Sequence, residues 1–315
     1  MSADPIVDIR DVWKRYDTTI AVAGISLRIE RGALLGLIGP NGAGKTSLMK
    51  MIATLAKPDR GTVKVMGRDV RVAVAPIRRR LGYMPAEFGK LPDMTVVEYL
   101  HYFGAAAGVP RAERERRVAD VLELVDLRDR ADSMVAAGST GIKQRILIAK
   151  TLVHDPDLLV LDEPAAGLDP RARIEIREIL RELNRIGKTI VVSSHILADL
   201  EEICDTVAII ELGRLVTHGA ITALTSSLRE RAETRTWRLR VPPEKVGPAR
   251  EALSEVPGLE GLARDEDGLR FRTETPDANA ALRALLDRDI PVLRWTEEGP
   301  RLEDVFMKQT EGTIT

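Results

Sequence analysis

The feature that most constrains this chain is the nonapeptide GPNGAGKTS at residues 39–47, which fits the pattern G-x-x-x-x-G-K-[ST]. Residues 33–38 before it (ALLGLI) are an unbroken apolar run, typical of a strand buried on both faces. Residues 44–55 after it carry apolar side chains at helical spacing. A strand, a glycine-rich loop and a helix in this order predict an α/β fold with a phosphate-binding loop. A plain glycine-rich turn before a helix is the alternative.

Each part of this loop has an expected task at a polyphosphate. Glycines let consecutive backbone N–H groups turn toward the phosphates, and the helix N-terminus adds partial positive charge. We expect Lys45 to neutralise β- and γ-phosphate oxygens, Thr46 to bind Mg²⁺ through its hydroxyl, and Ser47 to donate toward the α-phosphate. The candidate nucleotide-binding residues of the loop are Gly39, Pro40, Asn41, Gly42, Ala43, Gly44, Lys45, Thr46 and Ser47.

Two neighbouring acids, Asp162 and Glu163, follow a second apolar run at 158–161 (LLVL). In open α/β sheets, ligands bind at the carboxyl ends of the strands. Successive side chains alternate in direction, so one carboxylate can hold Mg²⁺ while the next faces an attacking water. We assign the metal role to Asp162 and the general-base role to Glu163. The alternative is a pair of solvated acids at a surface strand end.

The composition excludes several classes of protein. The chain has 315 residues, with 47 Lys+Arg against 48 Asp+Glu, and this balance argues against a protein that coats nucleic acid. No apolar run approaches the ~20 residues that a membrane helix needs, and the first residues lack a secretion-signal pattern. The single cysteine, Cys204, excludes an internal disulfide and favours a reducing cytoplasm.

Three more motifs continue the pattern along the chain. GSTGIKQR lies at 138–145, GLDP at 167–170, and Ser194-His195 follows an apolar strand. Together with the loop and LLVLDEP, they resemble the nucleotide-binding subunit of an ATP-binding-cassette (ABC) transporter over residues 6–225. The resemblance implies an ABC ATPase core in residues 1–228, with a mixed sheet and a helical subdomain at about 95–153.

The resemblance also implies functions for residues outside the loop and the acidic pair. His195 is expected to be the catalytic switch histidine, and Tyr16 to stack on adenine, with Trp13 as a weaker competitor. Ser139 and Gly141 are expected to contact ATP held by a second copy of the chain, with Asp169 at the same junction. Because one chain carries one loop and one signature segment, a complete site needs a head-to-tail dimer with ATP and Mg²⁺.

Two places depart from the family pattern. The signature segment (residues 138–145) has Gly138, Thr140 and Ile142 where the family has Leu, Gly and Gln. After Gly82-Tyr83-Met84-Pro85, Ala86 stands where the family usually has a glutamine that contacts Mg²⁺ and water, and Glu87 is out of register by one. This second departure predicts slower hydrolysis by an enzyme that is still active.

Residues 229–315 change in texture and predict the order strand, helix, strand, strand, helix, strand, which is that of a ferredoxin-like unit. We expect an α+β accessory domain that supports dimerisation or regulates the ATPase. Arginines between 229 and 240 predict either a surface for acidic lipid or a partner, or a solvated face of mixed charge. The segment 300–306 (PRLEDVF) resembles the tail of ATPase subunits from ABC-2-type exporters, whose membrane subunit is a separate polypeptide.

These expectations define one main hypothesis and two alternatives. The main hypothesis is an ATP-hydrolysing subunit that powers an exporter through a separate membrane-spanning permease, on the inner face of the cell membrane, with no nucleic-acid partner. The alternatives are a soluble ABC-type ATPase and a slow nucleotide switch that regulates without transport. In this family the membrane subunit selects the transported substrate, so this chain does not reveal it.

Overall fold

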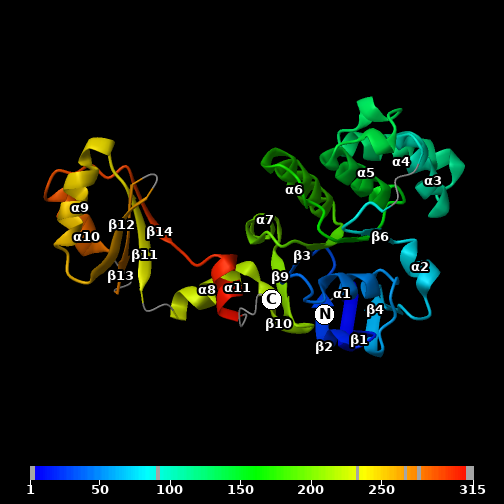
Figure 1. Ribbon diagram of the computed structural model, residues 1–315, viewed down its shortest axis with the longest axis horizontal. Coiled ribbons are helices and arrows are strands. Elements are labelled where there is room, and N and C mark those ends of the chain that lie inside the picture. The colour runs from blue at the N-terminus through cyan, green and yellow to red at the C-terminus, as the bar shows by residue number, and fades with distance from the viewer. Residues whose placement is uncertain (1–3, 90–92, 232–233, 266–267, 275–277, 310–315) are drawn as a thin grey trace. The chain divides into compact units, whose positions relative to one another are not determined.

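The computed structural model describes residues 4–89, 93–231, 234–265, 268–274 and 278–309 (Figure 1). It divides into two compact units: residues 1–221 with 306–315, and residues 222–305. The second unit starts in helix α8 (Ile221–Arg231), the same helix that contains the predicted start at 229. In the described part of the chain, no helix is both long and apolar enough to cross a membrane.

A six-stranded sheet forms the centre of the first unit, in the order β10-β9-β3-β8-β7-β6. Its strands are β3 (Leu34–Ile38), β6 (Leu81–Met84), β7 (Leu158–Leu161), β8 (Thr189–Ser193), β9 (Thr206–Glu211) and β10 (Arg214–Ala220). Neighbouring strands are parallel except for the β9–β10 pair. Every residue of β3, β7 and β8 is buried, as their apolar runs predicted. The parallel arrangement places the carboxyl ends of these three strands at one edge.

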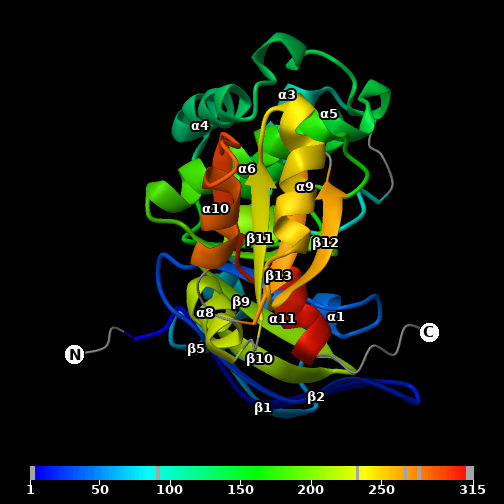
Figure 2. The same ribbon diagram turned by 90° about the vertical axis from the view of Figure 1, so that its left-hand side faces the viewer.

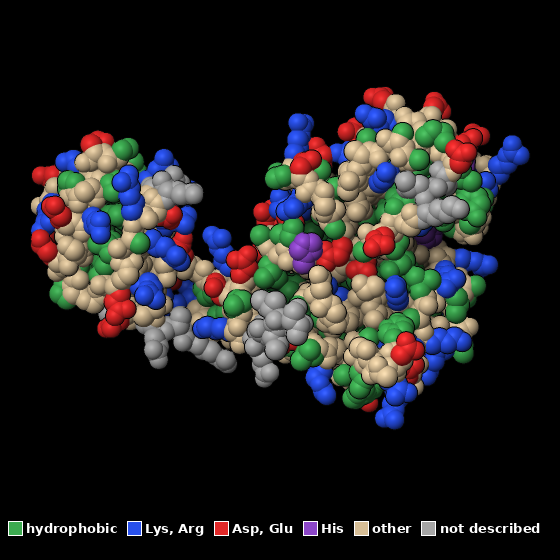
Figure 3. Space-filling view, in the orientation of Figure 1, with side chains coloured by type: hydrophobic (Ala, Val, Ile, Leu, Met, Phe, Trp, Pro, Cys, Tyr) green, Lys and Arg blue, Asp and Glu red, His purple; other side chains and the backbone are tan. Residues whose placement is uncertain are grey.

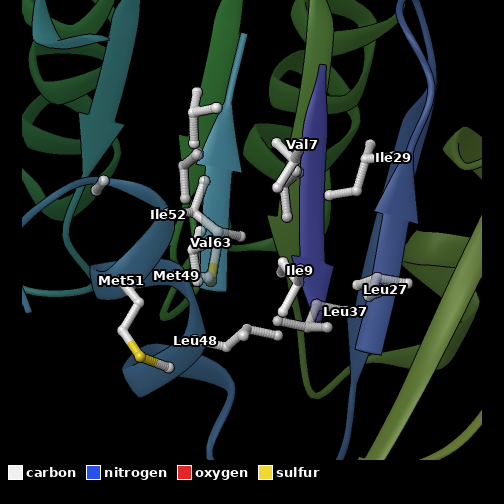
Figure 4. Packing of buried hydrophobic residues seen from close by; sticks show 14 of the residues in the cluster. Val7, Ile9, Leu27, Ile29, Leu37, Leu48, Met49, Met51, Ile52 and Val63 are labelled. Carbon is white, nitrogen blue, oxygen red and sulfur yellow. The ribbon is translucent and has the colours of Figure 1, made fainter. Parts of the chain in front are cut away.

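A second, antiparallel sheet has the order β2-β1-β4-β5. Its strands are β1 (Val7–Tyr16), β2 (Thr19–Ile29), β4 (Arg60–Val65) and β5 (Arg68–Asp69). The sequence of residues 6–10 predicts only a short strand, but β1 continues to Tyr16, because a register shift near Asp11 (φ 42°) interrupts the alternation of apolar side chains. Helix α1 (Lys45–Ile52) contributes Leu48 and Met49 to the same apolar cluster as Val7 and Ile9 of β1 (Figure 4).

Helices follow the sheets as predicted between 95 and 153. The helical subdomain consists of α3 (Val96–Ala106), α4 (Arg111–Leu124), the 3₁₀ turns Arg128–Arg130 and Val135–Ala137, and α5 (Thr140–Leu152). The remaining helices of the unit are α2 (Val74–Arg78), α6 (Pro170–Arg185) and α7 (Leu197–Ile203). Thr95 and Glu98 form a capping box that starts α3. The predicted α/β core with a helical subdomain is confirmed.

The second unit has a separate apolar core around Leu239, Leu253, Phe271 and Leu285. Figure 2 shows the helices and strands of this unit. Its elements are β11 (Arg235–Arg240), α9 (Val246–Ser254), β12 (Leu259–Asp265), β13 (Gly268–Thr273), α10 (Asn279–Leu286) and β14 (Arg294–Glu298). A 3₁₀ turn (Pro243–Lys245) precedes α9, and helix α11 (Leu302–Gln309) follows β14. The four strands form an antiparallel sheet in the order β12-β13-β11-β14. This is the predicted ferredoxin-like order of elements.

The arginines between residues 229 and 240, for which the sequence predicts either a partner surface or a mixed face, lie among acidic side chains. Arg229 pairs with Glu297, and Arg238 lies 2.8 Å from Asp265 and 3.0 Å from Glu298. The side chain of Arg231 lies outside the described residues. Side chains of both signs also alternate over the face shown in Figure 3. The alternative of a mixed, solvated face therefore describes these arginines.

Candidate nucleotide-binding and catalytic site

The phosphate-binding loop joins β3 to α1, as the sequence predicted. Gly44 directly precedes α1 and has a φ of 103°, a value that side chains disfavour. A Cβ at this position would lie 2.2 Å from the carbonyl oxygen of Ala21. Only glycine can therefore bring the N-terminus of α1 this close to β2.

Lys45 is the buried cation of this loop. Its Nζ donates to the carbonyl oxygens of Gly39 at 2.7 Å and Pro40 at 3.1 Å, and the residue is 7% exposed. Burial lowers the pKa of Lys45, and the charges of Glu163 and Asp162 oppose this effect. A phosphate oxygen that replaces the carbonyls would give this ammonium group a negatively charged partner.

Asp162 is buried at the end of β7, and both of its carboxylate oxygens accept hydrogen bonds from hydroxyl groups. Thr46 Oγ1 donates to Oδ2 at 2.8 Å, and Ser193 Oγ donates to Oδ1 at 2.7 Å. Ser193 is a site residue that the sequence motifs did not predict. Its signal is a hydroxyl at the end of the apolar strand β8, next to the strand that ends at the acidic pair.

The donor atoms of Thr46 and Asp162 suit Mg²⁺. This ion prefers hard oxygen ligands, and it usually keeps waters and phosphate oxygens besides one or two carboxylates. Among the described residues, no group of three or more His, Cys, Asp or Glu side chains could hold a metal ion alone. A hydroxyl and a carboxylate at the loop therefore fit an ion that arrives with a nucleotide.

Glu163 and His195 meet in front of the neighbouring ends of β7 and β8. His195 Nδ1 lies 2.8 Å from Glu163 Oε2. The backbone N–H of Glu163 donates to Ser193 Oγ at 2.9 Å, and Glu163 has a φ of 51°, which is uncommon for a residue with a side chain. The predicted base and the predicted switch histidine are in direct contact.

Tyr16 ends β1 and is 43% exposed. The Nζ of Lys14 lies 5.2 Å from the centre of its ring. The indole N–H of Trp13 instead donates to Asp11 Oδ1 at 3.0 Å. These contacts favour Tyr16 over Trp13 as the ring that is open to a base.

Ser139, Gly141 and Asp169 line a different place, a hollow of about 450 Å³ formed by residues from 126–145 and 167–172. Ser139 caps α5 by accepting a hydrogen bond from Ile142 N, and Asp169 caps α6 by accepting one from Ala172 N at 2.9 Å. We call this hollow the second half-site. None of its lining residues belongs to the phosphate-binding loop.

In the signature segment, the side chain of Ile142 accounts for the glycine at 138. A Cβ on Gly138 would lie 2.9 Å from Ile142 Cγ2, although the backbone of Gly138 (φ −68°, ψ 143°) suits any residue. The β-branched Ile142 therefore favours glycine at 138. The other departure from the family pattern follows β6, where both Ala86 and Glu87 are exposed.

Comparisons with known proteins agree with this geometry. Residues 22–166 match the family model described as "ABC transporter". The chain is 36% identical over 320 residues to "Nod factor export ATP-binding protein I" of Burkholderia thailandensis, covering 98% of each chain. It is 36% identical over 223 residues to "Linearmycin resistance ATP-binding protein LnrL" of Bacillus subtilis, covering 71% of this chain and 72% of the relative.

Solved structures show the same fold. The ATP-binding subunit of an ABC transporter matches with a TM-score of 0.66 at 31% identity, over 72% of this chain and 95% of that chain. An ATP-binding cassette solved as a dimer in a post-hydrolysis state, with ADP and Pi, matches with a TM-score of 0.63 at 25% identity. The latter match covers 68% of this chain and 98% of that chain. The chain belongs to the ABC transporter family, as a nucleotide-binding ATPase subunit.

Proposed function

We propose that this ATPase subunit powers export through a separate membrane-spanning permease, on the inner face of the cell membrane. One observation carries the catalytic part: beside Lys45, hydrogen bonds connect Thr46, Asp162, Ser193, Glu163 and His195 in one set, in which the Glu163 backbone N–H makes the link to Ser193. The export part is supported by the relative from Burkholderia thailandensis, which is named for Nod factor export and aligns over the whole chain.

In this mechanism the loop holds the triphosphate before any bond breaks. Backbone N–H groups of residues 41–47 and the Lys45 ammonium group bind the phosphates, and Tyr16 stacks on the adenine. Mg²⁺, when bound with the nucleotide by Thr46 and Asp162, would supply positive charge to the phosphate oxygens. Ser193 fixes the Asp162 carboxylate and the Glu163 backbone together, so the two carboxylates keep their separate tasks.

Glu163 then acts as the general base. Its carboxylate accepts a proton from the water that attacks the γ-phosphorus, while the bond to the β-phosphate oxygen breaks and ADP leaves. With its Nδ1 protonated, His195 donates to Glu163 Oε2 and holds the carboxylate in place. A positioned base of this kind contributes roughly 10²–10⁴-fold to a rate.

The second half-site completes the site of another copy. Ser139 presents a hydroxyl, and Gly141 lies in the first turn of α5, where free N–H groups can bind a γ-phosphate. Because these residues line a hollow that excludes the loop of their own chain, we propose that they bind ATP held by a second copy in a head-to-tail dimer. Asp169 lies at the same junction.

Purification from the native membrane tests the proposed export function. A tagged chain is expected to co-purify with a polypeptide that has several membrane spans. In proteoliposomes, that polypeptide should either raise the ATPase rate of the chain or transport its substrate when ATP is hydrolysed. Glu163→Gln is the control, because it should assemble but not drive transport. A chain that hydrolyses ATP at its full rate while staying free of membranes and of any such polypeptide would support the soluble ATPase instead.

A slow nucleotide switch remains the second candidate because of Ala86. An exposed alanine stands where the family usually places a glutamine, and a methyl group can neither bind Mg²⁺ nor orient water. Single-turnover hydrolysis separates the candidates. The export mechanism predicts a wild-type rate far above that of Glu163→Gln, whereas the switch predicts similar rates.

We further propose that the ferredoxin-like unit regulates the ATPase or supports dimerisation. Its apolar core is separate from that of the catalytic unit, which is consistent with an accessory domain. Replacing residues 234–298 by a short linker, which keeps residues 306–315 of the first unit, should change either the ATPase rate or the mass in solution. Unchanged values for both would exclude this function.

A further inference from the structure

We propose that Arg145 is a positioning residue for the second half-site, where it sets the distance between Ser139 and Asp169. This inference rests on the proposed function, in which both residues face ATP held by another copy. Arg145, Ser139 and Asp169 all line the same hollow.

The two helices of the second half-site are built alike. Ser139 is the N-cap of α5 and Asp169 is the N-cap of α6. Arg145 follows Ser139 by six residues, and Glu175 follows Asp169 by the same number. The guanidinium group of Arg145 and the carboxylate of Glu175 form an ion pair, so the second turn of α5 is tied to the second turn of α6.

The other side of the same guanidinium group reaches a third segment. Arg145 Nη1 donates to the carbonyl oxygen of Val125 at 2.9 Å, just after α4, and lies 3.5 Å from Asp126 Oδ2. The Arg145 side chain is only 16% exposed. One planar group therefore joins the residues just after α4 to both α5 and α6.

These contacts connect α5 of the helical subdomain to α6, close to the N-caps Ser139 and Asp169. A change in the separation of α5 and α6 would move Ser139 relative to Asp169, although neither residue itself contacts Arg145 in the described hydrogen bonds. Arg171 also approaches Glu175, at 3.4 Å, but its side chain is 91% exposed and is therefore a weak substitute.

The experiment separates nucleotide binding by one chain from ATP-dependent pairing of two. The background is Glu163→Gln, which should hold ATP without hydrolysing it. Arg145→Lys keeps the charge but loses the planar fork, and Glu175→Gln keeps the shape but loses the charge. Asp199→Asn is the control, because Asp199 pairs with Arg177 of α6 at 3.1 Å and neither residue lines the hollow. The Arg177 side chain is 14% exposed, close to the 16% of Arg145, and Asp199 is more buried than Glu175.

We expect the ATP affinity of all variants to stay within about twofold of the background. It is measured with a fluorescent ATP analogue at protein concentrations too low for the chains to dimerise. The ATP-dependent dimerisation constant, measured by sedimentation, should weaken about 10- to 100-fold for Arg145→Lys and Glu175→Gln, as expected for loss of a charged hydrogen bond. The control should pair like the background. Thermal unfolding identifies a misfolded variant, and Glu175→Gln decides the result if Arg145→Lys is unfolded.

The outcomes are distinguishable. If both variants pair as tightly as the background, Arg145 does not position the second half-site and the inference is overturned. If the control weakens as much as the two variants, general stability explains the effect and the inference also fails. If the Glu163→Gln background does not dimerise in the presence of ATP, the proposed dimer mechanism itself is wrong.

Discussion

The Nδ1 of His195 lies 2.8 Å from the Oε2 of Glu163, across the ends of two neighbouring strands. The contact joins the residue proposed to take a proton from water with the residue proposed to hold it in position. The same strand ends hold Asp162 through Ser193, so the metal-facing carboxylate and the base share one support.

Because His195 acts through Glu163, the two residues should not contribute independently. Glu163→Gln and His195→Ala should each lower ATP turnover by about 10²- to 10⁴-fold. The double variant should lose little more than the slower single variant, since residues in contact show non-additive effects. Steady-state ATPase assays with separate nucleotide-binding measurements test this, and two losses that multiply in the double variant would contradict it.

Ser193→Ala should impair both metal binding and stability. It removes the hydroxyl that donates to Asp162 Oδ1 and leaves the backbone N–H of Glu163 without its acceptor. An unsatisfied buried group costs about 1–3 kcal/mol of unfolding free energy. We expect a lower thermal midpoint and a higher Mg²⁺ requirement for ATP turnover. Ser194→Ala serves as the control, because it removes an acceptor for Ile196 N that does not contact Asp162 or Glu163 in the described hydrogen bonds, and it should retain the Mg²⁺ requirement.

Gly138 and Ile142 should behave as a coupled pair. Gly138→Ala places a methyl group 2.9 Å from Ile142 Cγ2 and should cost about 1–3 kcal/mol through overpacking. In an Ile142→Ala background the same change should cost much less, because that methyl group is gone. Chemical unfolding of the four proteins in the cycle measures the coupling free energy. If Gly138→Ala lowers the unfolding free energy equally in both backgrounds, contact with Ile142 is not what favours glycine at 138.

His154 should make the fold less stable in mild acid. Burial lowers the pKa of His154 below its usual value near 6.5, and its Nε2 lies 3.1 Å from the carbonyl oxygen of Leu81. Below about pH 6.5 the unfolded chain therefore binds a proton that the folded chain does not, and acidification favours unfolding. The thermal midpoint should fall between about pH 7 and 5, with a shallower slope for His154→Gln. Identical slopes would contradict this, while His218, whose pKa burial also lowers, accounts for slope that remains.

Local patterns predicted the parts of this molecule that depend on neighbours in the sequence. The apolar runs before Gly39 and Asp162 identify fully buried strands, and a parallel sheet then brings their ends together. The ferredoxin-like order followed in the same way from alternating segments and turns. Where an irregular register interrupts alternation, as near Asp11, the prediction ended β1 too early.

Contacts between distant segments could not be predicted from such patterns. Ser193 lies 31 residues from Asp162 in sequence, and Glu175 lies 30 residues from Arg145, so only the packed fold brings each pair together. Helix α8 was also not predicted, because its polar residues Thr222, Thr225 and Ser226 hide the helical repeat. The reason for Gly138 became visible only when its distance from the Ile142 side chain was known.

In the proposed mechanism, one chain is half of a catalytic unit. Turnover per chain, measured over a wide range of protein concentration together with mass in solution, tests this most directly. Turnover is expected to fall with dilution as the ATP-bound dimer dissociates, and replacing Ser139 by alanine should lower turnover even at high concentration. Full turnover by a single chain at high dilution, unaffected by Ser139→Ala, would show that one chain is a complete catalytic unit.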